Sequence, residues 1–267
     1  MQVAHLVSHW RREIAIECRF STEGSGEPLR AFGGRTRWLN EPLELQPNLL
    51  LRAVLTEREK VSQPLRIVTL TTGRRLFTDE READHVYFPL DCVISMTVAF
   101  ADGRRVEVLP VGREGAIGPP EPTVCLPGHE VVVSVGGKAL LLSLSDLLTI
   151  TAGNPALFDL FRQYISFSFA ATTQRAACFA LHQLDQRLAM WLWLTYRRVG
   201  AEIPVTHGWL SDLMGSTRAS VSMALGALAR QDTVRLRRGR VMVVEPRRLR
   251  ADACDCLRSL NRFPAEG

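Results

Sequence analysis

Hydrophobic and polar positions follow three different patterns along this 267-residue chain. From residue 65 to 145, short apolar runs alternate with turn signals every eight to ten residues. Asp102-Gly103 and Gly136-Gly137 are hinge sequences typical of β-hairpins. The predicted strands are 67–70, 85–88, 93–100, 105–111, 131–135 and 139–144. This pattern predicts a β-roll, a jelly-roll-like barrel, within an α+β chain.

A long helical pattern follows, from residue 154 to 182. Asn154-Pro155 opens it, because proline fits the first turn of a helix, where its missing N–H is not needed. The residues of its heptad-like seam are Phe158, Ile165, Phe169, Thr172, Ala176 and Phe179. Such a seam must be covered, either by the chain's own roll or by a second copy. We expect a homodimer through this helix, and a second helix at 183–199 that leads to the next domain.

The C-terminal pattern, residues 205–244, combines two short amphipathic helices with a ribbon. Thr206 is placed to cap the first helix, and Gly215 supplies the tight turn before the second. The early outward face of the second helix carries Ser216, Thr217, Arg218, Ser220 and Ser222. Arg238 and Arg240 lie at the tip of the ribbon. The pattern predicts a winged helix-turn-helix, with these side chains against the major groove and the DNA backbone.

Basic charge is concentrated in the same region. Residues 206–250 hold nine arginines against three acidic residues, a net charge of +6, whereas the whole chain carries +5. The only lysines are Lys60 and Lys138, so the choice of arginine itself says little. The clustering is nevertheless the electrostatic signature of a phosphate-binding surface. Double-stranded DNA is therefore the expected partner.

Length and composition fit two domains with modest cores. No run approaches the roughly 18 apolar residues that a membrane helix needs, and no export signal is visible. The six cysteines form no disulfide framework, which favours a cytoplasmic location. The expected organisation is an N-terminal extension at 1–45, a sensor roll at 46–153, a dimerisation helix at 154–182, a DNA-binding domain at 183–258 and a tail at 259–267.

Catalytic motifs are not apparent in the sequence, which contains no phosphate-binding loop, nucleophile elbow or paired-histidine motif. The glycines at 112, 115 and 118 imitate a dinucleotide fingerprint, but Pro119-Pro120 prevents a helix from starting there. We therefore expect a non-enzymatic protein. The alternative to a sequence-specific regulator is a β-roll module that acts through protein partners and binds DNA only nonspecifically.

Several short motifs occur in an informative order along the chain. They are Tyr87-Phe88-Pro89, Gly112-Arg113-Glu114-Gly115 with Gly118, Asn154-Pro155, Arg187-Leu188-Ala189, and the Met-Gly-Ser-Thr-Arg-Ala-Ser-Val segment at 214–221. Over about residues 46–258 the chain resembles the Crp/Fnr family of bacterial transcription regulators. The resemblance implies a homodimer that binds a two-fold symmetric operator. RNA polymerase stays open as a further partner.

The resemblance also allows the sensor to be compared with known types. Cyclic-nucleotide members hold the phosphate on an Arg-Ser pair, but this chain has no arginine from 114 to 161. Burying a phosphate without a guanidinium partner is costly, so we do not expect cyclic AMP to bind. By the resemblance, an effector pocket would lie between Glu114 and the helix face that carries Thr172 and Thr173. The effector itself stays unidentified.

Metal and cofactor sites are not predicted. The oxygen-sensing branch of the family holds an iron–sulfur cluster on N-terminal cysteines, and only Cys18 lies in that region here. Cys254-Asp255-Cys256 lacks a second pair with the usual zinc spacing. We interpret these two cysteines as small residues that pack a terminal helix. The histidines show no metal-ligand spacing within one element.

The recognition helix departs from the best-known pattern of the family, Arg-Glu-x-x-x-Arg. Arg218 matches the first arginine, but Ala219 replaces the glutamate and Met223 replaces the second arginine. Contacts of the missing side chains with cytosine and guanine are therefore unavailable. We expect a target sequence different from the familiar half-site.

Overall fold

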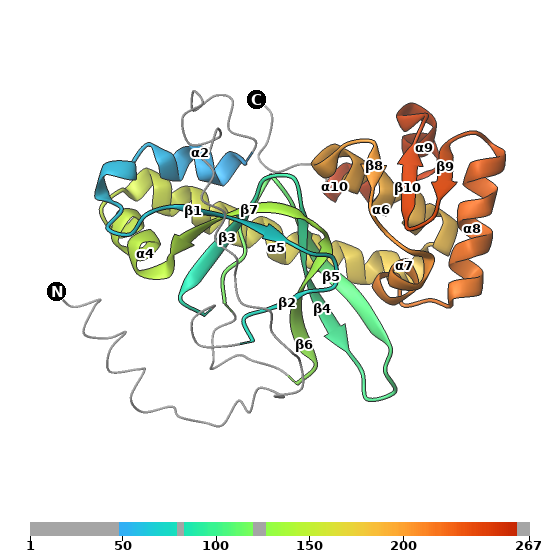
Figure 1. Ribbon diagram of the computed structural model, residues 1–267, viewed down its shortest axis with the longest axis horizontal. Helices are drawn as coiled ribbons and strands as arrows, with labels where there is room; N and C mark the ends of the chain where they lie inside the picture. Colours follow the sequence, from blue (N-terminus) through green and yellow to red (C-terminus); the bar gives the residue numbers. More distant parts are fainter. Residues whose placement is uncertain (1–47, 79–82, 120–126, 261–267) are drawn as a thin grey trace.

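The computed structural model describes residues 48–78, 83–119 and 127–260. The expectations for 1–45, for Cys18 and for most of the tail lie outside these residues. Two parts of the molecule, a roll and a helical domain, are connected by long helices (Figure 1). None of the helices in the described ranges combines the length and apolarity that a bilayer crossing requires.

The roll consists of two antiparallel sheets. One has the order β1 (Arg66–Leu70), β7 (Gly137–Ser143), β3 (His85–Pro89), and the other β2 (Arg75–Leu76), β6 (His129–Val135), β4 (Val93–Ala99), β5 (Arg105–Val111). Val68 and Leu141 of the first sheet share a buried core with Ile94 and Val133 of the second. Every predicted strand is present, with ends shifted by at most two residues.

Short helices cover the other side of the first sheet. They are α2 (Leu49–Leu55), the 3-10 turn η3 (Arg58–Lys60) and α4 (Leu144–Ala152), which the sequence patterns did not predict. Leu51 and Ile150 pack with Phe88 and Leu140 in a second core. Asn48 caps α2, and its amide also donates to the Gly115 carbonyl at 2.7 Å.

The long helix α5 (Pro155–Leu181) begins as expected, since the Asn154 side chain accepts from the backbone N–H of Leu157. It passes the roll and reaches the second domain (Figure 1). Helix α6 (Leu184–Val199) follows and is buried from Leu188 to Thr195.

The C-terminal domain continues with β8 (Glu202–Ile203), α7 (His207–Leu213), α8 (Arg218–Arg230), β9 (Val234–Arg237), β10 (Arg240–Val243), α9 (Pro246–Asp252) and α10 (Leu257–Leu260). Its sheet has the order β8-β10-β9, so the expected two-stranded ribbon has a third strand. Trp191 of α6 packs with Leu210, Val221 and Leu225 of the two following helices in one core.

The roll and the helical domain meet at a buried polar cluster, which we call the joint. Its centre is Glu107 on β5, whose side chain is fully buried. The carboxylate accepts hydrogen bonds from Ser95 (2.6 Å), Ser134 (3.0 Å), Arg175 of α5 (3.0 Å) and the Trp191 indole of α6 (2.7 Å). One carboxylate therefore connects the roll to both long helices.

Candidate nucleic-acid interface

Helices α7 and α8 start and turn where the sequence predicts. The Thr206 hydroxyl accepts from the Trp209 N–H at 3.1 Å, and the Thr217 hydroxyl accepts from the Ser220 N–H at 3.1 Å. Between the helices, Gly215 has φ +57°, a left-handed conformation that favours glycine. A side chain there would also meet Val106 of the roll at 3.4 Å. The turn thus depends on glycine for its conformation, and it lies in contact with β5.

The outward face of α8 is small and apolar. Val221 and Leu225 point into the core, whereas Ala219 and Met223 are exposed, Met223 with 70% of its surface. These two positions are four residues apart and so lie on one face of the helix. Arg218 is exposed in the first turn beside them. In a major groove this face offers one guanidinium and an apolar surface suited to thymine methyl groups.

The polar side chains predicted to face DNA mostly form hydrogen bonds within their own domain. The hydroxyls of Thr206 and Thr217 act as helix caps, and Ser220 bonds Thr217 at 2.9 Å. Ser222 is half-buried and bonds His207 of α7 at 2.9 Å. Ser216 is half-buried in the turn. The structure therefore brings Arg218 and Met223, more than the serines, to the outer surface.

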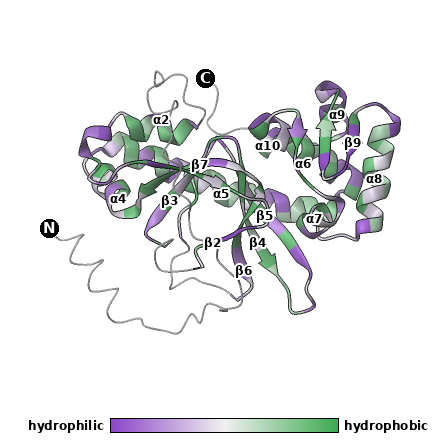
Figure 2. Ribbon diagram, viewed as in Figure 1, coloured by the Kyte–Doolittle hydropathy of each residue, from purple (hydrophilic) through white to green (hydrophobic). Residues whose placement is uncertain are grey.

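The wing presents the basic side chains. Arg238 and Arg240 are exposed at the β9–β10 tip, where Gly239 has φ +72°. The Arg240 guanidinium also forms an ion pair with Glu202 of β8. Hydrophilic colour follows β9 in Figure 2, where Arg235 and Arg237 are exposed at alternate positions. A recognition helix and a basic ribbon thus stand side by side on one domain.

Comparison with known proteins agrees with this geometry. The sequence of residues 186–252 matches the Crp-like helix-turn-helix domain family. These residues form a Crp-like helix-turn-helix domain. No curated protein sequence matches it significantly.

Solved structures share the fold of about 70–74% of this chain at low sequence identity. FixK2 from Bradyrhizobium japonicum has 14% identity and a TM-score of 0.54, with 72% of this chain and 98% of that chain covered. A Crp/Fnr-family transcriptional regulator from Thermus thermophilus has 20% identity and a TM-score of 0.54, with 70% and 98% covered. A further Crp/Fnr-family regulator, from Eubacterium rectale, has 13% identity and a TM-score of 0.51, with 74% and 93% covered.

The predicted seam of α5 is largely exposed on the single chain. Ile165 and Phe169 are 66% and 76% exposed, and Phe158 and Ala176 are also exposed. Phe179 differs, because it is half-buried and the guanidinium of Arg187 lies 4.5 Å from the centre of its ring. Four of the seam positions therefore form an apolar row, which we call the α5 row: Phe158, Ile165, Phe169 and Ala176.

Side chains of the roll and of the long helices meet near Glu114, in the region of the expected effector pocket. Glu114 receives two hydrogen bonds from Arg198 of α6, at 2.5 and 3.2 Å. The Tyr164 hydroxyl donates to the Ala116 carbonyl at 2.9 Å, and a side chain at Gly115 would overlap the Tyr164 ring. Burial raises the pKa of Tyr164, so it stays neutral. Roll and helix are thus in direct contact at this level.

Thr172 and Thr173 do not approach Glu114 through hydrogen bonds in the described residues. Their hydroxyls donate to carbonyls one turn earlier on the same helix, at 2.9 and 3.0 Å. Thr172 is half-buried and Thr173 is exposed.

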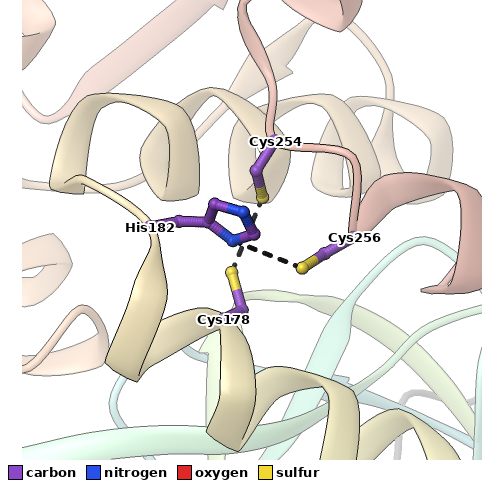
Figure 3. A group of neighbouring side chains, drawn as sticks. All are labelled: Cys178, His182, Cys254 and Cys256. Carbon is purple, nitrogen blue, oxygen red and sulfur yellow. Dashed lines mark hydrogen bonds between the residues drawn. The ribbon is translucent and has the colours of Figure 1, made fainter.

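A cluster absent from the sequence predictions is found where α5 ends. Cys178 and His182 face Cys254 and Cys256, and the four ligand atoms all lie within 4.8 Å of one another (Figure 3). Cys254 and Cys256 are buried, as expected of packing residues, but their thiols meet other metal-binding groups. The hydrogen bond with Cys178 lowers the pKa of Cys254 to about 6. The available signal was the Cys-x-x-x-His spacing, which places both groups on one helical face.

Proposed function

We propose that this chain is a Crp/Fnr-type regulator that binds a two-fold symmetric DNA operator as a homodimer, in the cytoplasm, and controls transcription there without responding to cyclic AMP. The observation that carries the proposal is the combination of an exposed apolar row on α5 with an outward recognition helix and a basic wing. The first feature supports pairing of two copies, and the others support DNA as the partner.

The argument for the dimer rests on the α5 row. Its outermost large side chains, Phe158 and Phe169, are eleven residues apart, so the bulky part of the row extends for about 16 Å along the helix. Large apolar side chains exposed along such a length mark an interaction surface. A second α5 offers the same row and covers it symmetrically. Two α8 helices related by that symmetry would enter successive major grooves about 34 Å apart.

The argument for sequence readout rests on α8. Arg218 can donate to guanine or to a phosphate, while Ala219 and Met223 favour thymine methyl groups. The wing arginines add phosphate contacts that do not depend on sequence. We therefore expect half-sites in which A·T pairs dominate the positions that face Ala219 and Met223.

The proposed insensitivity to cyclic AMP rests on the contacts that Glu114 and Gly115 already make in the region of the expected effector pocket. Glu114 already carries a two-point interaction with Arg198, and Tyr164 occupies the space beside Gly115. A nucleotide would have to break that ion pair and would find no arginine in the segment 114–161 for its phosphate. Calorimetry is expected to detect no micromolar binding of cyclic AMP.

The decisive experiment selects operators from random DNA and footprints the enriched sequence. We expect a discrete protected site with two inverted halves one helical turn apart. Protection without any preferred sequence would contradict the proposal and favour a β-roll module that acts through protein partners.

Dimerisation is tested by the double substitution Ile165→Glu with Phe169→Glu. Two buried charges on each side of the interface should separate the copies, and operator affinity should fall by more than about 100-fold, since each monomer then binds only one half-site. Analytical ultracentrifugation measures the mass. The matched control is Leu148→Glu, which changes an exposed leucine on α4. A double variant that stays dimeric would exclude the α5 row as the interface.

A further inference from the structure

Three thiols and one imidazole converge where the long helix meets the end of the DNA-binding domain. Cys178 lies in the last turn of α5 and His182 is the residue that caps it. Cys254 and Cys256 come from the segment between α9 and α10, more than 70 residues later. In Figure 3 all four side chains point toward a common centre.

The spacing of the four groups fits a tetrahedral metal ion. With Zn–S bonds of about 2.3 Å and a Zn–N bond of about 2.0 Å, neighbouring ligand atoms should be separated by about 3.5–3.8 Å. The sulfurs of Cys178 and Cys254 are 3.5 Å apart, and Cys256 Sγ lies 3.4 Å from His182 Nδ1. A disulfide would require about 2.05 Å between two sulfurs. The distances therefore agree with a shared ion and not with a covalent bond.

We propose that Cys178, His182, Cys254 and Cys256 bind one Zn²⁺ ion as a structural Cys₃His site. Thiolate and imidazole ligands suit zinc, whereas Mg²⁺ and Ca²⁺ prefer oxygen. Protein-bound iron–sulfur clusters are held mainly by four thiolates, and here the fourth group is an imidazole. Four protein ligands fill the tetrahedron, so the site has no open position for catalysis.

Neighbouring side chains support the four ligands in the way that zinc sites require. His182 turns Nδ1 toward Cys256, and its Nε2 lies 3.3 Å from the carboxylate of Asp255. This is the carboxylate–histidine arrangement that orients a metal-binding imidazole. The Gln174 amide donates to Cys256 Sγ at 3.1 Å. Asp255 itself is 81% exposed, so it stays outside the site while the two cysteines beside it are buried.

The ion would fasten the C-terminal segment to α5. Cys178 and His182 belong to the helix that carries the α5 row, and Cys254 and Cys256 belong to the domain that carries α8. Closing a loop of this length reduces the freedom of the unfolded chain, and metal binding adds its own folding free energy. Zinc would thus fix the DNA-binding domain on the long helix. Only this consequence for DNA rests on the proposed function; the metal site does not.

Metal content is the first test, measured by inductively coupled plasma mass spectrometry on full-length protein purified without chelator. We expect about one zinc per chain. The variant Cys254→Ser with Cys256→Ser should lose at least 90% of it, while Cys92→Ala, which changes a buried cysteine of the roll, should retain it. Iron in place of zinc, or a Cys178–Cys254 disulfide in the freshly purified protein, would overturn the assignment.

Cobalt provides a test that does not depend on the folding of a variant. Metal-free wild-type protein titrated with Co²⁺ should develop the visible bands of a tetrahedral thiolate site and saturate at one ion per chain.

Asp255→Asn should weaken metal binding by about 10–100-fold, as losses of such outer partners do. Asp212→Asn, another exposed aspartate of the domain, should not change it. Octahedral cobalt spectra, or equal affinity in both variants, would contradict the site as drawn.

The effect of zinc on DNA binding is measured in a separate experiment. Removing zinc from wild-type protein should lower operator affinity and Tm together, and adding zinc back should restore both. Zinc bound without any DNA recognition would refute the proposed function but leave the metal site intact. DNA recognition by a protein that never binds zinc would refute the metal site but leave the proposed function intact.

Discussion

The joint and the proposed DNA face, which consists of α8, the β9–β10 wing and the adjoining strand β8, use the same residue types in opposite surroundings. In the joint, Glu107 and Arg175 form an ion pair with side chains only 0% and 3% exposed. On the DNA face, the Arg240–Glu202 pair is 57% and 46% exposed. Water can replace either partner of the exposed pair, whereas the buried pair has only protein groups to replace a lost charge. The joint is therefore suited to holding two domains in one arrangement, and the DNA face keeps its charges available for phosphates.

Arg175 shows how strongly the joint depends on its carboxylate. Burial lowers the pKa of this guanidinium, and the charge of Glu107 acts in the opposite direction. Its Nη2 also reaches the Glu107 backbone carbonyl at 3.3 Å, while Nε and Nη1 have no hydrogen-bond partner among the described residues. Within the described residues, both hydrogen bonds that compensate for burying this cation thus go to one residue, Glu107.

Glu107→Gln is the substitution expected to lower the unfolding free energy most. Glutamine can keep some hydrogen bonds but leaves Arg175 charged and unpaired in the interior, which should cost about 3–5 kcal/mol of unfolding free energy. Urea denaturation measures the loss. The control Glu130→Gln removes a carboxylate from β6 of the same sheet. Its ion pairs with Arg75 and Arg105 are partly exposed, so the change should cost about 1 kcal/mol or less.

A second substitution separates the charge effect from the loss of packing. Adding Arg175→Met to Glu107→Gln removes the unpaired cation and should recover part of the stability, because the two residues are directly coupled. If the double variant were no more stable than Glu107→Gln alone, the ion pair would not be the source of the effect.

Arg218→Ala tests the DNA face where it is expected to read sequence. If the guanidinium contacts a base, affinity for the selected operator should fall by about 1–3 kcal/mol, with little change on random DNA. Arg230→Ala, at the other end of α8, is the matched control and should affect the operator less. An equal loss on both DNAs would assign Arg218 to a phosphate contact.

Local sequence signals were sufficient to predict most of the helices and strands, but they did not predict the contacts between them. Hinge glycines and β-branched runs gave the strands, and Asn154, Thr206 and Gly215 marked where helices begin or turn. Helices α2 and α4 were missed because seven or nine residues are too few for a clear helical period, and no capping or turn signal of the kind that marked the equally short α7 was recognised there. The two-residue strand β8 was missed for the same reason.

The joint and the cysteine cluster could not be read from the sequence because their members are far apart in it. Glu107 and Arg175 are separated by 68 residues, and Cys178 and Cys254 by 76. Only the fold brings them together. Phe179 illustrates the same limit: its heptad position favoured the seam, but Arg187 from the next helix covers its ring.

The smallest expected effects concern the exposed Arg240–Glu202 pair. Arg240→Ala should weaken binding to all DNA sequences alike and should reduce the slope of log K against log salt by about 0.9, the contribution of one phosphate contact. Glu202→Gln should act in the opposite direction, because it releases Arg240 from its ion pair and makes the guanidinium fully available. Neither change should alter unfolding free energy by more than about 1 kcal/mol, since both side chains are solvated. Affinity measured from low to high salt on operator and random DNA tests both. A sequence-dependent loss for Arg240→Ala would place the wing tip against base edges, and an unchanged slope would remove it from the interface.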